Sequence, residues 1–437
     1  MESVKPRSYG LDALRGLAIL GMALSGMIPW GTLPPWMYHA QLPPPKHQLD
    51  LSISGLTWVD LVFPFFLFAM GAAVPLARPQ SILRVVGRFL SLAAFAIVVQ
   101  SLRTFTITGK PDASDWWLSI GTFALMVLAW GRWPSPAPKV GKRQLPLGPV
   151  LNISGVLGLV AILITTRYAD GSGFDLKRSD PILLSLANCA LVLGMLWHLA
   201  RTKPWVWCMV WGAIALMFIS RDLSVGKMIW NWSPAKWLIS WDYLKWSLVA
   251  IPGMAATLHF RRHEDPSRRP LAIPVVVSFF TLWAGLAVEG PLRSALIALA
   301  VSIAVVEWLR WPAHIAGRFA VMVGAILAMT IGAVRKDTAT LAYLVGTPFA
   351  AALALSMADA SRVDRPGYLV LVGMNPMLGY ITITHLVPAL IRLTGLHGWV
   401  GEQGWSPWTL ACYGLAQTLV VAAVCVVASR KRFFLRT

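Results

Sequence analysis

Hydrophobic runs of about 15 to 25 residues recur along the whole chain, and helical runs of that length span or nearly span a bilayer. Short polar or proline-containing stretches separate them. Fourteen such segments can be drawn, at residues 12–30, 58–77, 82–102, 117–131, 149–166, 181–200, 205–220, 243–260, 271–288, 292–309, 316–334, 338–357, 367–393 and 409–428. Because two of them are short, the pattern predicts an all-α polytopic bundle of roughly 11 to 14 transmembrane helices. We expect it to form one domain over residues 1–437.

Composition and charge favour a membrane protein and argue against a nucleic-acid partner. The chain is 57% hydrophobic and only 13% charged, unlike soluble domains. Its net charge of +19 comes from small basic groups between apolar segments, not from one basic face. With the N-terminus in the cytoplasm, most of these groups fall in cytoplasmic loops, which is the positive-inside pattern. The lipid bilayer is thus the first expected partner, with both termini in the cytoplasm.

Ionisable residues lie in or beside the first two apolar segments. Such groups are unfavourable at membrane depth unless they are paired or hydrated, so they indicate a functional site. Asp12 and Arg15 share a helix face, and form either an intrahelical ion pair or a site for a phosphate or carboxylate. Asp60, four residues before the helix-breaking Pro64, either caps freed backbone donors or orients a nearby imidazole.

The loop between these two segments carries His39 and His47, on either side of the prolines at 43–45. Consecutive prolines favour a stiff, extended chain, which would hold an imidazole in place. Histidine is the side chain best matched to general-base catalysis near neutral pH. Both residues could equally be solvated loop histidines, and the choice between them stays open at this point.

Two polar motifs interrupt the second half of the chain. GMNPMLGYITITH places Asn375 and His385 in an apolar segment broken by proline, where polar groups line a substrate site or join helices. RKDTAT places Arg335, Lys336 and Asp337 in a turn that is external in this topology. That exception to the charge bias favours contact with a ligand. Neither a glycine-rich phosphate loop nor a His/Cys metal spacing occurs, so we expect no metal.

Four motifs together resemble one family. In the same order along the chain, the heparan-alpha-glucosaminide N-acetyltransferases and their bacterial relatives carry motifs similar to LDALRG (Leu11–Gly16), GLTWVDLVFPFFLFAMG (Gly55–Gly71), RKDTATLAYL (Arg335–Leu344) and GMNPMLGYI (Gly373–Ile381). The resemblance covers residues 8–77 and 335–393, whereas residues 110–310 are only generically similar.

The resemblance implies an enzyme of the bacterial inner membrane. It would move acetyl from cytoplasmic acetyl-CoA, as co-substrate, to the amine of a terminal glucosamine on the far side. His39, which is followed by alanine as in the family, is the better match to the family's essential histidine, with His47 as the alternative. Asp60 carries over as well. Where the family has an asparagine near the end of the first helix, this chain has Ser25 and Gly26.

The chemistry of acetyl transfer assigns expected roles to these residues. Histidine can serve as a base or carry the acetyl, and the two routes are not distinguished here. Asn375 is the expected donor to the tetrahedral oxyanion. Arg15, Arg84 and Arg88 are candidates for the CoA phosphates. The residues expected to bind substrate or co-substrate are Asp12, Arg15, Arg335, Lys336, Asp337 and His385.

Two other functions fit parts of the pattern. A membrane O-acyltransferase for envelope polysaccharide would share the same opening motif. A transporter or flippase for a sugar or lipid would use the buried polar groups to coordinate its solute, but the chain shows no matched half-repeats. The expected partners of the acetyltransferase are acetyl-CoA and an amino sugar or glycan acceptor, and a homodimer is left open.

Overall fold

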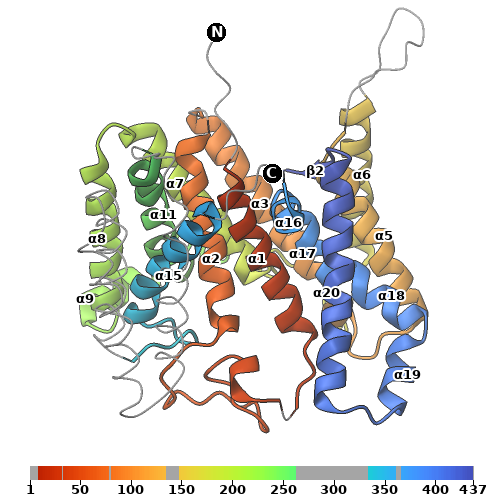
Figure 1. Ribbon diagram of the computed structural model, residues 1–437. Coiled ribbons are helices and arrows are strands. Elements are labelled where there is room, and N and C mark those ends of the chain that lie inside the picture. The colour runs from red at the N-terminus through yellow and green to blue at the C-terminus, as the bar shows by residue number, and fades with distance from the viewer. Residues whose placement is uncertain are drawn as a thin grey trace, which may run out of the picture.

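The computed structural model describes residues 8–31, 33–77, 80–133, 147–261, 333–360 and 366–436. Within these ranges the regular secondary structure is helical except for two strands of two residues each (Figure 1). Among the described residues, seven helices are long and apolar enough to cross a bilayer, or eight if two consecutive helices bent by 114°, α8 (Pro204–Ser220) and α9 (Ser224–Asn231), form one span. The protein is therefore an all-α polytopic integral membrane protein, as the hydrophobic pattern predicts.

The described elements fall into two groups along the chain. Those before residue 262 are α1 (Tyr9–Met27), η1 (Pro35–Met37), α2 (Trp58–Ala73), η2 (Val74–Leu76), α3 (Ile82–Ser101), α4 (Thr104–Ile107), α5 (Ala113–Trp130), β1 (Gly131–Arg132), α6 (Leu147–Thr165), α7 (Pro181–Ala200), α8, α9, α10 (Trp241–Leu244) and α11 (Ser247–Arg261). Those after residue 332 are α15 (Leu341–Ala360), α16 (Tyr368–Gly373), α17 (Pro376–Ile381), the π-helical turn η4 (Thr382–Leu386), α18 (Val387–Leu393), α19 (Leu396–Glu402), α20 (Pro407–Arg430) and β2 (Phe434–Leu435).

Eleven of the fourteen predicted apolar segments coincide with helices. The segments at 271–288, 292–309 and 316–334 lie wholly or largely outside the described residues. Among the others, the predicted segment at 243–260 is α10 followed by α11, and the one at 367–393 is broken into α16, α17, η4 and α18. The single domain over residues 1–437 stays a prediction.

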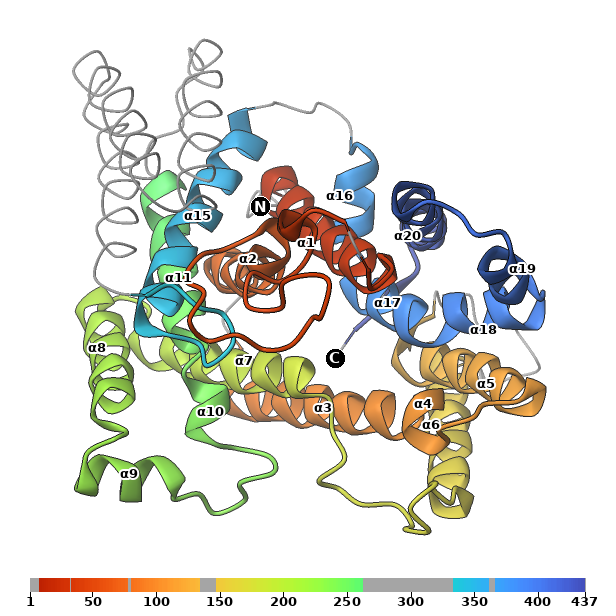
Figure 2. The same ribbon diagram turned by 90° about the horizontal axis from the view of Figure 1, so that it is seen from below.

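Two helices, α1 and α2, form the centre of the bundle (Figure 2). α2 packs against α1, α11 and α15, while α1 also contacts α16 and α20. Small residues let these backbones touch: a Cβ atom on Gly373 would overlap the carbonyl of Asp12, and one on Gly71 would overlap the carbonyl of Ala250. The first two predicted segments are thus the helices around which the others are arranged.

The connection between α1 and α2 lies at one end of the bundle, and the two strands lie at the other (Figure 1). β1 and β2 pair antiparallel, with Gly131 opposite Leu435. The start of α1 is at the strand end, since Asp12 touches Gly373 just before Asn375, which bonds β2. We call the two ends the loop end and the strand end.

Candidate functional site

Asp60 lies at the start of α2 and anchors the loop that precedes the helix. Its Oδ2 atom accepts hydrogen bonds from the N–H of Thr57 (2.9 Å), the hydroxyl of Thr57 (3.2 Å) and the N–H of Ala40 (3.1 Å). Thr57 is the N-cap residue, and its reciprocal contacts with a side chain three positions later form a capping box. The carboxylate is completely buried and held in one orientation.

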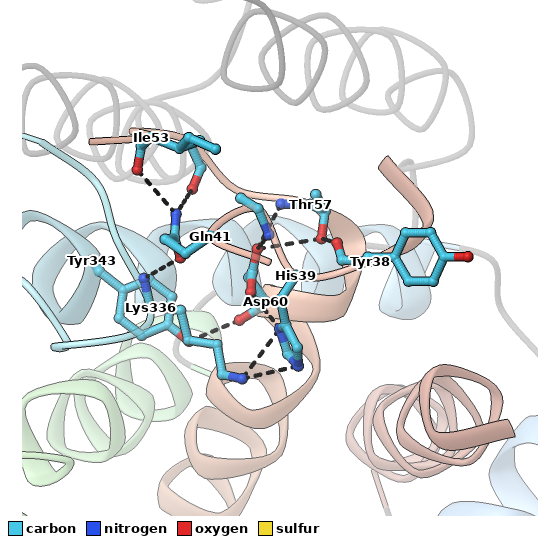
Figure 3. A network of polar contacts seen from close by, with 10 residues as sticks. Tyr38, His39, Gln41, Ile53, Thr57, Asp60, Lys336 and Tyr343 are labelled. Atoms are coloured by element: carbon cyan, nitrogen blue, oxygen red, sulfur yellow. Dashed lines mark hydrogen bonds and ion pairs between the residues drawn. The ribbon is translucent and has the colours of Figure 1, made fainter. Parts of the chain in front are cut away.

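The other oxygen of Asp60 faces His39. Nδ1 of His39 lies 2.7 Å from Oδ1 of Asp60 (Figure 3). Because a carboxylate can only accept, this contact assigns a proton to Nδ1, and in the neutral ring Nε2 keeps its lone pair. The side chain of His39 is 29% exposed, while that of Asp60 is not exposed at all. An accessible imidazole oriented by a buried carboxylate is suited to general-base or nucleophilic catalysis.

Lys336 comes to the same histidine from the turn before α15. Its Nζ atom lies 3.1 Å from both Nδ1 and Nε2 of His39 (Figure 3). An atom equally far from both nitrogens at that distance would overlap Cε1 if it lay in the ring plane. The lysine nitrogen must therefore stand over the face of the imidazole. Burial lowers the pKa of Lys336, and the negative charges of Asp337 and Asp60 offset part of that shift.

Hydrogen bonds from side chains and backbone fix this turn against the loop that carries His39. The buried amide of Gln41 accepts from the N–H of Lys336 (3.2 Å) and donates to the carbonyl of Gly55 (3.2 Å). The N–H of Gly55 in turn donates to the carbonyl of Val334 (2.9 Å). The guanidinium of Arg335 bonds the carbonyl of Leu51. These contacts join residues almost 300 positions apart. Several hydrogen bonds between the turn and the histidine loop therefore hold Lys336 beside His39.

Sequence reasoning missed three members of this assembly. Gln41 carries no local signal, because its role depends on the distant turn. Thr57 could have been found, since a threonine three residues before an acid at the start of an apolar run is a capping signature. Tyr343 donates from its hydroxyl to the backbone carbonyl of Asp60 (2.8 Å) and is fully buried, but its sequence context resembles that of any core tyrosine.

Asp337 brings an unused acceptor to the same region. Its Oδ2 atom is buried and has no hydrogen-bond partner among the described residues. A buried carboxylate oxygen without a donor is unfavourable, so such an atom indicates a place where a ligand or water donates. Arg335 bonds backbone through one guanidinium nitrogen, but its Nε atom, like Oδ2 of Asp337, is buried and has no hydrogen-bond partner among the described residues.

His47 occupies a different environment in the same loop. Its Nδ1 lies 3.2 Å from the carbonyl of Leu42, and its Nε2 lies 3.0 Å from the carbonyl of Gly31. Its ring packs edge-on against Trp30 and Tyr38, with centroids 4.7 Å and 4.5 Å away. Both nitrogens are thus engaged with backbone. Of the two alternatives left open by the sequence, the geometry places His39 rather than His47 in the candidate site.

Asn375 is not part of this site, contrary to the expectation that it polarises the reacting carbonyl. Its Nδ2 donates to the carbonyl of Phe433 (2.8 Å), and its Oδ1 accepts from the N–H of Leu435 (3.1 Å). It is completely buried, and its bonds to the residues of β2 and just before it place it at the strand end. The asparagine breaks the helix and uses its amide to hold β2, which the sequence could not show because its partners lie about 60 residues further on.

His385 is likewise separate from the His39 site. It lies in the π-helical turn η4, where its Nδ1 is 2.8 Å from the hydroxyl of Thr384 and its carbonyl accepts from Ser119 (3.1 Å). Its Nε2 is buried and has no hydrogen-bond partner among the described residues. No contact in the described chain joins it to His39, Asp60 or Lys336.

Asp12 and Arg15 lie near the strand end and form the intrahelical ion pair that the spacing allows, at 3.1 Å. Arg15 also donates to the carbonyl of Ala69 on α2 (3.3 Å). With Arg88 of α3, it lines a pocket of about 130 Å³ between α1, α2, α3 and α7. Arg88 is exposed and lines this pocket. Arg84, one turn earlier, is exposed and does not line it.

Two guanidinium groups around one small pocket favour an anion with several oxygen atoms, such as a phosphate. The pocket is smaller than the roughly 300 Å³ at the lower end of sites that enclose a whole ligand. It could therefore hold phosphate groups but not an entire nucleotide. Among the described residues, no group of three or more His, Cys, Asp or Glu side chains is placed to hold a metal ion.

Comparison with protein families finds one sequence profile that matches the chain. The sequence profile described as DUF5009, a domain of unknown function, matches residues 7–259, more than half of the chain. The chain belongs to the DUF5009 family. The DUF5009 match contains His39, Asp60, Arg15 and Arg88, and it ends before Lys336. A search of curated proteins found no match.

Proposed function

We propose that this protein is a membrane acetyltransferase that moves acetyl from acetyl-CoA to the amine of a glucosamine-type sugar. The observation that carries the proposal is the His39–Asp60 pair, in which Nδ1 contacts the carboxylate at 2.7 Å and the histidine side chain is 29% exposed. An oriented imidazole of this kind suits acyl transfer, as base or as acetyl carrier. The motif resemblance to the glucosaminide acetyltransferases supports the same reaction class.

The roles of the site residues follow from their contacts. In this proposal His39 acts through Nε2, either removing the proton of the attacking amine or accepting the acetyl group itself. Asp60 fixes the ring orientation and stabilises positive charge on it. The Lys336 nitrogen stands over the ring and would donate to the developing oxyanion when it is charged. This contact replaces the role that the sequence assigned to Asn375.

Acetyl-CoA would reach this histidine through the bundle. We place its phosphates at Arg15 and Arg88, which line one pocket near the strand end. Arg15 touches α2 at Ala69, nine residues from Asp60, which is roughly 14 Å along the helix. An extended phosphopantetheine arm can cover such a distance. The separation of Ala69 from Asp60 along α2 is thus compatible with phosphates in the pocket and a thioester near His39.

The acceptor would approach from the loop end. The unpartnered Oδ2 of Asp337 is buried near Lys336 and can accept from a sugar hydroxyl or an ammonium group. This placement agrees with an N-terminus in the cytoplasm and a bacterial inner-membrane location, because it puts the His39 loop outside. The resemblance and the charge bias of the loops support that orientation.

Labelled acetyl-CoA and glucosamine test the proposal in detergent or proteoliposomes. We expect transfer by the native protein and no detectable transfer by His39→Ala. His397→Ala is the matched control, since His397 is an exposed histidine on α19 and no contact in the described chain joins it to His39. Absence of transfer by well-folded native protein across several amino sugars, together with absence of acetyl-CoA binding by calorimetry, would overturn the acetyltransferase.

The same proteoliposomes separate the alternatives. Transfer to hydroxyls of a polysaccharide but not to amines would indicate an O-acyltransferase, with the same histidine and the same anion pocket. Uptake of a sugar without any acetyl-CoA binding would indicate a transporter.

A further inference from the structure

The amine closest to the reactive ring of His39 belongs to the protein itself. Nζ of Lys336 lies 3.1 Å from Nε2, the ring nitrogen not used by Asp60. It reaches the ring over its face, as the equal distance to Nδ1 requires. Other lysines of the external loops, such as Lys46 and Lys110, are exposed and have no contact with His39 in the described chain.

This approach matches the geometry of attack on an acylated imidazole. An acetyl group on Nε2 is conjugated with the ring and lies in the ring plane, so its carbonyl carbon is open to nucleophiles only from the two faces. That carbon is one bond from Nε2. Its distance from Nζ of Lys336 would therefore be close to the roughly 3–3.5 Å separation of a near-attack pair. The lysine nitrogen already stands on one of those faces.

We propose that Lys336 is a self-acetylation site, at which the protein transfers acetyl from acetyl-CoA to its own side chain when no external acceptor is bound. The inference rests on the proposed acetyltransferase function and adds a regulated modification to the same site. An external amine and Lys336 would compete for one acetyl group.

The reaction balances without any further reactant. Nε2 of His39 attacks the thioester carbonyl, a C–N bond forms, and the C–S bond breaks to release the CoA thiolate. The neutral amine of Lys336 then attacks the acetyl carbon, forming an amide bond while the C–Nε2 bond breaks. The proton lost from Nζ goes to the CoA thiolate. The products are N-acetyl-Lys336, CoA thiol and the original neutral imidazole.

Acetylation would switch the site off. The amide has no ammonium charge, so it cannot stabilise an oxyanion as a cation does. It also fills the ring face from which an external amine attacks. The environment of Lys336 supports its role as nucleophile, because burial lowers its pKa despite the opposing effects of Asp337 and Asp60, which raises the neutral fraction at a given pH.

Peptide mapping after incubation with labelled acetyl-CoA, without sugar, tests the inference. We expect label on the peptide that contains Lys336 and none on Lys46, the matched exposed lysine. His39→Ala should lose the Lys336 label, and Lys336→Arg should show no acetylated residue in that turn.

Between pH 6 and 9 the labelling rate should rise with pH, since the attacking amine must be neutral. Groups facing this amine are His39, Asp60 and Asp337.

The outcomes separate this inference from the proposed function. Transfer to glucosamine without label on Lys336 would overturn self-acetylation and leave the enzyme intact. Equal label on Lys46 and Lys336, or label that persists in His39→Ala, would show non-enzymatic acetylation and also overturn it. Preincubation with acetyl-CoA alone should lower the later rate of sugar acetylation severalfold. In Lys336→Gln, which resembles the acetylated state, preincubation with acetyl-CoA should not lower the rate of sugar acetylation below that variant's own initial rate.

Discussion

The loop end and the strand end of the bundle both contain buried polar side chains, but these side chains are bonded differently. At the loop end, His39 contacts both Asp60 and Lys336, and its side chain is partly exposed. At the strand end, both polar atoms of Asn375 are used on the backbone of the C-terminal segment. The ionisable side chains bonded at the loop end include a partly exposed ring that a substrate can meet, whereas the amide of Asn375 is saturated by backbone and holds the C-terminal segment.

His47 shows that this difference depends on bonding rather than on position. It lies eight residues from His39 in the same loop, yet its ring nitrogens face the carbonyls of Leu42 and Gly31. Its contacts resemble those of Asn375 at the other end of the molecule. We therefore class His47 with the structural groups, and the substitutions below test that division.

The largest expected effect is that of His39→Ala. Removing the reactive imidazole should lower kcat for acetyl transfer by about 10⁴-fold or more, as loss of a catalytic histidine does elsewhere. His47→Gln should instead lower thermal stability and leave kcat within about threefold per folded molecule. Steady-state kinetics and an unfolding scan on both variants check this. Equal kinetic loss in the two variants would erase the distinction between the two histidines.

Asp60→Asn should have the next largest effect. The NH₂ group of the new asparagine would face either Nδ1 of His39 or the N–H of Thr57. Both of these groups are donors and need an acceptor. We expect kcat to fall roughly 10³-fold, because changing an orienting carboxylate to an amide costs up to about 10⁴-fold in a comparable triad. Asp50→Asn, in the exposed part of the same loop, is the control. Unchanged kcat in Asp60→Asn would remove Asp60 from the mechanism.

The anion pocket near the strand end extends the comparison, since Arg88 faces a cavity rather than a backbone group. Arg88→Ala should raise the KM for acetyl-CoA about tenfold, while the KM for glucosamine stays the same. Arg84→Ala is matched in charge and helix but does not line the pocket, so its KM should be close to the native value. If both variants raised KM equally, general surface charge rather than a phosphate site would be the explanation.

The sequence predicts more of the fold than of the site, for physical reasons that particular residues show. Apolar length alone identifies α1, α2 and α3, because bilayer thickness fixes helix length. The proximity of Asp60 to a histidine is favoured because both histidines lie in the loop that leads into α2, and Asp60 is in the first turn of that helix. By contrast, the contact of Lys336 with His39 joins residues 297 positions apart, and no local pattern encodes it. Asn375 was placed in the site wrongly because the C-terminal segment that uses its amide has no sequence signature.

The smallest expected effect on catalysis is that of Asn375→Leu, which tests the strand end directly. The substitution removes two buried hydrogen bonds to backbone and leaves the carbonyl of Phe433 and the N–H of Leu435 without partners. We expect a loss of about 1–3 kcal/mol in stability, seen as a lower unfolding temperature in detergent. The kcat of the remaining folded protein should change less than threefold, because Asn375 lies far along the bundle from His39. A large fall in kcat with unchanged stability would return Asn375 to the catalytic site and break the division between the two ends.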